Sequence, residues 1–315
     1  MHMPWTAADI PDQTGRTAVV TGANSGLGYH TALELARRGA HVVLACRDAG
    51  RGGDALRRLT TAAPGASVEL AALDLADLAS VRLFAGSFLD GRDRLDLLVN
   101  NAGVMAVPLR RTADGYESQF ATNHLGHFAL TGLLLPALLA RPGARVVTVS
   151  SNVHRLGRID FDNLNAERSY AKWRAYGQSK LANLLFTLEL QRRADDARVD
   201  LVAVAAHPGY AATNLQFAGP RLSGSRFRER VNALLNRLVA QPDEMGALPT
   251  LYAATDPAVR GGDFVGPDGP FERSGHPQLV SMAKQALDRD TARRLWEVSE
   301  RLTGVRYDAL APAGS

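Results

Sequence analysis

Short apolar runs that alternate with helical segments are the feature that most constrains the fold of this chain. The runs, which are rich in residues typical of strands, lie at 17–21, 41–45, 67–75, 95–101, 144–151 and 199–209. Apolar residues at helical spacing recur between them, at 78–89, 116–140 and 177–194. Strands that are apolar along their whole length indicate a parallel sheet with both faces covered. The sequence therefore predicts an α/β fold, a doubly wound parallel sheet with helices on both faces.

Two segments interrupt this alternation. Residues 210–242 contain Gly219-Pro220 and a cluster of serine and glycine, and an insertion after the carboxyl end of a strand would cover a ligand crevice. The apolar residues of this predicted lid suggest a lipophilic ligand. Residues 275–315 are expected to form a C-terminal helical tail, with helical spacing over 287–303. Both segments are expected to belong to a single domain that spans 1–315.

A glycine-rich turn follows the first predicted strand. Residues 21–28 read TGANSGLG and stand between a strand and a helix. Gly22, Gly26 and Gly28 permit a tight turn and a close approach of the backbone to a pyrophosphate, and the helix N-terminus offers free N–H groups. In this context the turn predicts a dinucleotide-binding Rossmann fold.

The composition argues against several other classes of protein. The formal net charge is +4, the 36 lysines and arginines are dispersed and aromatic residues make up 6%, so nucleic-acid binding is not expected. The sequence has no HExxH motif and no cluster of cysteine and histidine, so no metal site is expected. Cys46 is the single cysteine, and the first residues contain no apolar segment, so we expect a cytoplasmic protein without a signal peptide or membrane anchor.

Several motifs occur in a fixed order along the chain. They are TGANSGLG at 21–28, ACRD at 45–48, LDL at 73–75, NNAG at 100–103, TNHLGHF at 122–128, VSS at 149–151, YGQSK at 176–180 and HPG at 207–209. In this order they resemble the short-chain dehydrogenase/reductase (SDR) family, above all its branch of retinol dehydrogenases and protochlorophyllide reductases. The resemblance implies hydride transfer between a nicotinamide cofactor and the carbon of a carbonyl or alcohol group.

Tyr176 and Lys180 are expected to carry the acid–base chemistry. They are one helical turn apart and share a face. A phenol with an ordinary pKa near ~10 is a poor acid or base at neutral pH, and a nearby ammonium favours the phenolate and lowers that pKa. Lys180 is one of only three lysines in the chain, and its compact ammonium could also donate a hydrogen bond to a ribose hydroxyl of the cofactor.

The resemblance adds Ser151 and Asn123 to the catalytic group. Ser151 ends a predicted strand, and the carboxyl ends of the strands face the crevice, so its hydroxyl would hold a substrate carbonyl beside Tyr176. Ser150 is the alternative. Asn123 lies on a long predicted helix, where it would bend the helix and hold a water that links Lys180 to solvent.

The resemblance also implies which residues contact the cofactor. Asp74 would accept a hydrogen bond from the adenine amine, Gly103 would pass close to the ribose and Thr213 would contact the nicotinamide amide. The complete predicted set is Gly22, Asn24, Ser25, Gly26, Leu27, Gly28, Arg47, Asp74, Leu75, Asn101, Ala102, Gly103, Tyr176, Lys180, Pro208, Gly209 and Thr213.

The choice between the two nicotinamide cofactors depends on the residues after the second predicted strand. Arg47 can bind a 2′-phosphate in a bidentate manner, which favours NADP(H). Asp48 follows directly and could bind a ribose 2′-hydroxyl, so NAD(H) stays open.

The predicted function is therefore NADP(H)-dependent hydride transfer to or from a lipophilic aldehyde, ketone or alcohol, with Tyr176 as the proton donor or acceptor. One alternative is a regulatory protein that binds NADP without turnover, although such a protein would be expected to lose Tyr176 or Lys180. Another is a reductase of a ring double bond, for which the crevice motifs offer no cysteine as an additional proton donor. A homodimer stays open, because family members commonly pair through the helices at 116–140 and 177–194, and the tail could favour or block this contact.

Overall fold

A single sheet of eight strands forms the centre of the computed structural model, which describes residues 4–210 and 241–311. The strands are β1 (Thr17–Thr21), β2 (His41–Cys46), β3 (Val68–Ala72), β4 (Leu97–Asn100), β5 (Ala144–Val149), β6 (Leu201–Ala206), β7 (Phe264–Pro267) and β8 (Pro277–Leu279). Their order is β3-β2-β1-β4-β5-β6-β7-β8, and neighbours are parallel except for β7 and β8. The chain changes direction between β1 and β4, which is where a doubly wound sheet forms its ligand crevice.

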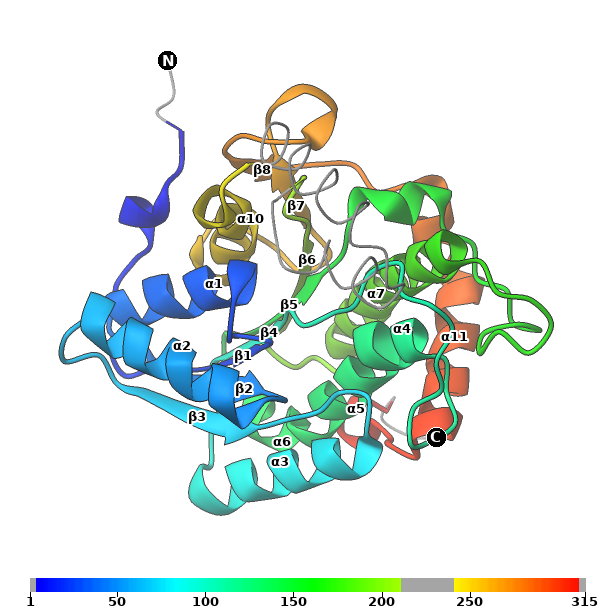
Figure 1. Ribbon diagram of the computed structural model, residues 1–315, viewed down its shortest axis with the longest axis horizontal. Helices are drawn as coiled ribbons and strands as arrows, with labels where there is room; N and C mark the ends of the chain where they lie inside the picture. Colours follow the sequence, from blue (N-terminus) through cyan, green and yellow to red (C-terminus); the bar gives the residue numbers. More distant parts are fainter. Residues whose placement is uncertain (1–3, 211–240, 312–315) are drawn as a thin grey trace.

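Helices cover both faces of this sheet (Figure 1). They are α1 (Gly26–Arg37), α2 (Ala49–Ala62), α3 (Leu78–Gly91), α4 (Ser118–Phe120), α5 (Gly126–Leu133), α6 (Leu135–Leu139), α7 (Lys172–Asp196), α10 (Asp243–Thr255) and α11 (Arg289–Thr303). One face packs against α1, α2 and α10, and the other packs against α3, α5 and α7. The doubly wound α/β fold predicted from the sequence is thereby confirmed.

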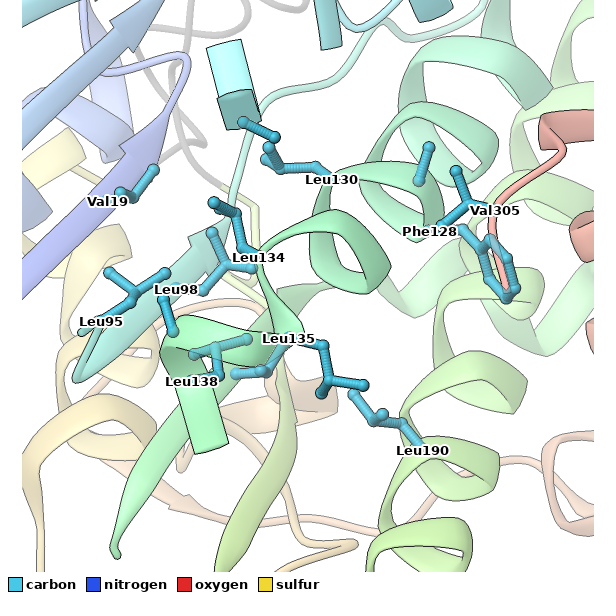
Figure 2. Packing of buried hydrophobic residues seen from close by; sticks show 14 of the residues in the cluster. Val19, Leu95, Leu98, Phe128, Leu130, Leu134, Leu135, Leu138, Leu190 and Val305 are labelled. Carbon is cyan, nitrogen blue, oxygen red and sulfur yellow. The ribbon is translucent and has the colours of Figure 1, made fainter. Parts of the chain in front are cut away.

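The alternation of side chains along β1 divides the core into two layers. Val19 packs on the side of α3 and α5, whereas Ala18 and Val20 pack on the side of α1 and α10. Figure 2 shows part of the first layer, whose buried cluster includes Leu98 and Leu134. Because both faces of the sheet are buried, its central strands are apolar at most positions.

Several elements differ from the sequence prediction. The helix expected over 116–140 consists of α4, a π-helical turn at Ala121–Leu125, α5 and α6. Helix α7 begins earlier than predicted, at Lys172. Strands β7 and β8 were not predicted, because each is too short to give a clear apolar run, and the edge strand β8 is the antiparallel exception to the predicted parallel sheet.

The C-terminal tail packs against α5 and α7. The ring of Trp296 in α11 is buried, and its centroid lies 5.1 Å from that of Phe128 and 5.8 Å from that of Phe186. Beyond α11, which ends at Gly304 with a φ of 63°, the hydroxyl of Tyr307 donates to the carbonyl of Phe128 at 2.6 Å. The tail therefore covers the outer surface of α5 and α7.

The predicted lid at 210–242 lies almost entirely outside the described residues. Only Tyr210, Gln241 and Pro242 belong to the described part of the chain. Within the described ranges, no helix combines the length and the apolar character that crossing a bilayer requires.

Candidate active site

A cleft of about 260 Å³ lies at the carboxyl ends of β1, β2 and β4. Most of the predicted cofactor-binding residues line it, namely Gly22, Asn24, Ser25, Gly26, Leu27, Gly28, Arg47, Asp74, Leu75, Asn101, Ala102 and Gly103. The remaining lining residues are Ala45, Asp48, Arg51, Leu73, Val104 and Thr122. The fold thus brings five separate motifs of the sequence to one edge of the sheet.

Glycines allow the loops of this cleft to approach one another. Gly22 has a φ of +67°, and a Cβ at this position would lie 3.0 Å from the Cα of Ala102. A Cβ at Gly28 would overlap the amide of Asn101 and the carbonyl of Gly22. The hydroxyl of Thr21 accepts hydrogen bonds from the N–H groups of Asn101 and Ala102, each at 2.9 Å. These loops form a narrow cradle beside the N-terminus of α1, which fits a pyrophosphate.

Two arginines line the cleft after the end of β2, Arg47 in the loop and Arg51 in the first turn of α2. Asp48 is the N-cap of α2, and its carboxylate accepts hydrogen bonds from the backbone N–H of Arg51 at 2.9 Å and from its Nε at 3.2 Å. These bonds, the backbone one first, lower the pKa of Asp48 below its ordinary value. The Asp48 carboxylate is therefore engaged by the first turn of α2.

Tyr176 and Lys180 lie one turn apart on α7 and are only 4% and 3% exposed. The Lys180 Nζ lies 5.8 Å from the centroid of the Tyr176 ring and donates a hydrogen bond to the carbonyl of Val149 at 3.0 Å. Gly103 of the cleft is near the same ammonium, since a Cβ at Gly103 would lie 3.6 Å from Nζ. The hydroxyl of Ser151 accepts from the N–H of Val153 at 3.3 Å, and its side chain lies close enough to Tyr176 to lower the pKa of the phenol. The catalytic candidates therefore adjoin the nucleotide cleft.

Burial sets the acidity of the tyrosine and of the lysine. It raises the pKa of Tyr176 to about 12, against the smaller lowering effect of the Ser151 side chain. It also lowers the pKa of Lys180 to about 8. The direction of the Tyr176 pKa shift is opposite to the lowering expected from Lys180, because the phenolate loses its hydration in a buried site. At neutral pH the phenol is protonated and the lysine is charged. In this state Tyr176 can donate a proton.

The two serines that end β5 have different environments. Ser150 is 2% exposed, and its hydroxyl donates to the backbone carbonyl of Lys180 at 2.8 Å. Ser151 is partly exposed and is the N-cap of the 3-10 turn Asn152–Leu156. Only Ser151 has its hydroxyl next to Tyr176, so the geometry favours Ser151 over its neighbour.

Asn123 lies in the π-helical turn that interrupts the predicted helix. Its Oδ1 accepts from the N–H of Val104 at 2.8 Å, and its Nδ2 donates to the carbonyl of Val104 and to the hydroxyl of Ser179, each at 2.9 Å. A π-turn is rare and frequently marks a functional site. Here it aims the Asn123 amide at the loop after β4 and at α7, between the cofactor cleft and the tyrosine.

Known proteins with a similar sequence or structure identify the family of this chain. The family model described as short chain dehydrogenase matches residues 16–219. The chain is 42% identical to human retinol dehydrogenase 13 over 302 residues, which are 95% of this chain and 86% of that protein. The crystal structure of an uncharacterized protein from Mycobacterium paratuberculosis has a TM-score of 0.79 and 49% identity, and the match covers 97% of this chain and 99% of that one.

A second solved structure was determined with NADP. It is described as an NAD(P)-dependent gluconate 5-dehydrogenase from Beutenbergia cavernae, with NADP bound at low occupancy. It has a TM-score of 0.60 and 27% identity, and the match covers 79% of this chain and 94% of that one.

The chain belongs to the short-chain dehydrogenase family. It is an oxidoreductase of the retinol-dehydrogenase-like branch and acts on alcohol or carbonyl groups, as the sequence predicts.

Two further predicted cofactor residues of this dehydrogenase, Pro208 and Gly209, do not line the cleft. Pro208 and Gly209 follow β6, which is hydrogen-bonded to β5 and so lies beside the strand that ends at the catalytic serine. Thr213 lies outside the described residues. Asn100, the first residue of NNAG, donates from its buried side chain to the hydroxyl of Thr131 at 3.0 Å and does not line the cleft.

Two residues of the site were missed by sequence reasoning. Arg51 was missed because α2 was not predicted, although Asp48 before a helical segment is a typical N-cap signal. Trp173 was missed because α7 was expected to begin later. Its ring meets that of Tyr176 edge to face, with the centroids 6.2 Å apart, and Trp173 is 53% exposed.

The histidines and the cysteine of the described chain have structural partners. The ring of His124 is buried and hydrogen-bonds the hydroxyl of Ser299 in the tail at 2.9 Å. Burial raises the pKa of the Cys46 thiol to about 11, as for a packing residue. Among the described residues, no group of histidine, cysteine, aspartate or glutamate side chains is arranged to hold a metal ion.

Proposed function

We propose that this dehydrogenase transfers hydride reversibly between NADP(H) and the carbonyl or alcohol carbon of a lipophilic small molecule. The observation that carries the proposal is the placement of Tyr176 and Lys180 one turn apart on α7, with the Lys180 ammonium next to Gly103 of a cleft that fits a dinucleotide. A bound nicotinamide would supply or accept the hydride.

The protein side chains would bind the substrate oxygen and transfer a proton to or from it. In the direction of reduction, the hydroxyls of Ser151 and Tyr176 hold the carbonyl oxygen, and Tyr176 donates its proton to it. Lys180 stabilises the resulting phenolate by its charge and can donate further hydrogen bonds, since the Val149 carbonyl takes only one of its three N–H groups. Asn123 would link this group to solvent through a bound water.

NADP(H) is favoured over NAD(H) because of the residues after β2. Arg47 and Arg51 both line the cleft, whereas the carboxylate of Asp48 is occupied by its bonds to Arg51. The guanidinium of Arg47 matches a 2′-phosphate, and a carboxylate committed to a helix N-terminus is poorly available to a 2′-hydroxyl. NAD(H) would be the weaker cofactor.

Exposed apolar side chains near the catalytic group support a lipophilic substrate. Trp173 meets Tyr176, and Leu156, which is 84% exposed, ends the 3-10 turn that Ser151 caps. Phe271 is 85% exposed, and its carbonyl accepts a hydrogen bond from the side chain of Asn152, next to Ser151. Large apolar side chains exposed together near a polar catalytic group are typical of a site for an apolar ligand.

The decisive test follows NADPH and NADH oxidation at about 340 nm with a panel of lipophilic aldehydes and ketones. We expect turnover with a preference for NADPH, a loss of at least about 100-fold in Tyr176→Phe, and no loss in the control Tyr252→Phe on α10. Full activity of Tyr176→Phe would refute the proposed proton donor. Binding of NADPH by the wild-type protein without turnover on any substrate would favour the regulatory alternative.

We also propose that the chain does not form a dimer through α5 and α7. Trp296 and Tyr307 of the tail occupy the outer surface of these helices, so a second copy would have to displace them. Sedimentation velocity should give a monomer or a dimer that survives substitution of exposed residues on α11.

A cytoplasmic location is a further part of the proposal, and it rests on the single cysteine, Cys46, which cannot form an intramolecular disulfide.

A further inference from the structure

The loop between β7 and β8 contains two consecutive residues with left-handed backbone. Phe271 and Glu272 both have a φ of 55°. Neither is glycine, and this conformation is unfavourable for residues with a side chain, so the surrounding contacts have to hold it in place. Such conformations cluster at functional sites, and this loop contacts residues next to the catalytic group.

Glu272 connects two side chains from different strand ends. Its Oε1 accepts a hydrogen bond from the Nη2 of Arg155 at 3.0 Å, and its Oε2 lies 3.0 Å from the Nε2 of His207. The hydrogen bond from His207 is the main cause that lowers the pKa of Glu272 below its ordinary value. The carboxylate is therefore charged and bonded on both oxygens at neutral pH.

The ring of His207 connects Glu272 to the turn after β6 through its two nitrogen atoms. Its Nδ1 accepts a hydrogen bond from the N–H of Gly209 at 3.2 Å, so Nε2 carries the proton of the neutral ring and donates it to Glu272. The ring is fully buried and lies directly against Gly266 of β7, where a Cβ would overlap it. The backbone of the same loop holds the next residue, because the N–H of Tyr210 donates to the carbonyl of Arg273 at 2.7 Å.

On the other side, Glu272 holds the segment that follows the catalytic serine. Arg155 belongs to the 3-10 turn that Ser151 caps. Asn152, next to Ser151, donates from its side chain to the carbonyl of Glu272 at 3.3 Å. One loop residue thus joins the end of β5, where Ser151 lies, to the end of β6, where Pro208 and Gly209 lie.

We propose that Glu272 is a positioning residue that fixes the Pro208–Gly209 turn relative to Ser151 and thereby holds the nicotinamide end of the cofactor against the catalytic group. This inference rests on the proposed cofactor chemistry. The adenine end would be held elsewhere, at Arg47 and at the glycine-rich turn, which Glu272 does not contact. A change at Glu272 should therefore affect one half of the cofactor and spare the other.

Two ligands distinguish binding of the nicotinamide end of the cofactor from binding of its adenine end. NADP contains both halves, whereas 2′-phospho-ADP-ribose lacks the nicotinamide ring. We expect Glu272→Ala to weaken NADP binding by about 10-fold, the size of one lost charge-assisted hydrogen bond, and to leave 2′-phospho-ADP-ribose unchanged, both measured by calorimetry. Glu272→Gln keeps an acceptor for His207 and should stay within about threefold of the wild type for both ligands. Glu297→Ala, at an exposed glutamate of α11, is the matched control.

The outcomes distinguish the inference from the proposed function. If the wild-type protein binds neither NADP nor NAD, the proposed cofactor chemistry fails and the inference fails with it. If the wild type binds NADP and Glu272→Ala binds it equally well, or weakens both ligands by the same factor, the positioning role is refuted while the proposed function stands. If Glu272→Ala does not fold, Glu272→Asp is compared in the same way, because its shorter side chain cannot reach both Arg155 and His207.

Discussion

The pH dependence of activity should reveal the buried ammonium of Lys180. Burial lowers its pKa from an ordinary 10.5 to about 8, so its charge is lost in a range where a surface lysine keeps it. The proposed mechanism needs that charge to stabilise the phenolate of Tyr176. The phenol itself, with a pKa of about 12, stays protonated throughout this range. One ionisation should therefore dominate the alkaline limb of the profile.

The expected loss of activity follows from the fraction of protonated lysine. At pH 9 a group with a pKa of about 8 is protonated in about one molecule in ten, whereas an ordinary lysine is protonated in more than about nine in ten. The value of kcat/KM for NADPH, which reports the ionisation of the free enzyme, should therefore fall about tenfold between pH 7 and pH 9. Above pH 9 it should fall about tenfold for each further pH unit.

The variant Lys180→Arg provides the control, because a guanidinium stays charged at every pH of the experiment. Its activity should be lower at pH 7, since the fork of arginine fits poorly into a site shaped for lysine, but its alkaline limb should disappear. A wild-type profile that stays flat to pH 9.5 would refute the reasoning, and so would an unchanged limb in Lys180→Arg, which would assign the ionisation to another group.

Three further predictions test the cleft, the tail and the substrate. Arg47→Ala should raise the KM for NADPH by about tenfold and leave the KM for NADH unchanged, and Arg57→Ala, an exposed arginine of α2, should change neither value. Gly132→Ala would place a Cβ 2.7 Å from two side chains of the tail and should lower the free energy of unfolding by about 1–3 kcal/mol in urea titrations. Gly86→Ala in α3, which would meet nothing within 4 Å, should be neutral or stabilising, and equal effects would contradict the tail contact. Trp173→Ala should raise the KM for long-chain aldehydes more than that for acetaldehyde, and a parallel rise for both would refute its role in the apolar site.

The sequence allowed much of the fold to be predicted because its signals are local. The apolar runs of β1, β2, β5 and β6 are buried on both faces, so each strand can be recognised without knowledge of its neighbours. The turn from Gly22 to Gly28 has its strand before it and its helix after it within a few residues. The short strands β7 and β8 could not be predicted, because they depend on pairing at the edge of a sheet that already exists.

Within the site, some residues could likewise be assigned from local sequence signals, whereas others could be assigned only from tertiary contacts. Tyr176 and Lys180 share a face of one helix, and this relation is fixed by a spacing of four residues. The distinction between Ser150 and Ser151 depends on which side chain lies next to the Tyr176 phenol, and the distinction between Arg47 and Asp48 depends on where α2 begins. Neighbouring residues of the same type look alike until the fold gives each one a different partner.

The sequence by itself determined the sheet, the glycine-rich turn and the spacing of the tyrosine and lysine, because these follow from the conformational preferences of short segments. Only the tertiary structure decided that the tail covers α5 and α7 and that Glu272 meets His207, a partner 65 residues away. Burial of the catalytic pair, which shifts both pKa values, was likewise decided by tertiary packing. Contacts between distant segments form only when the whole core assembles, and hydration is lost only in that assembled state.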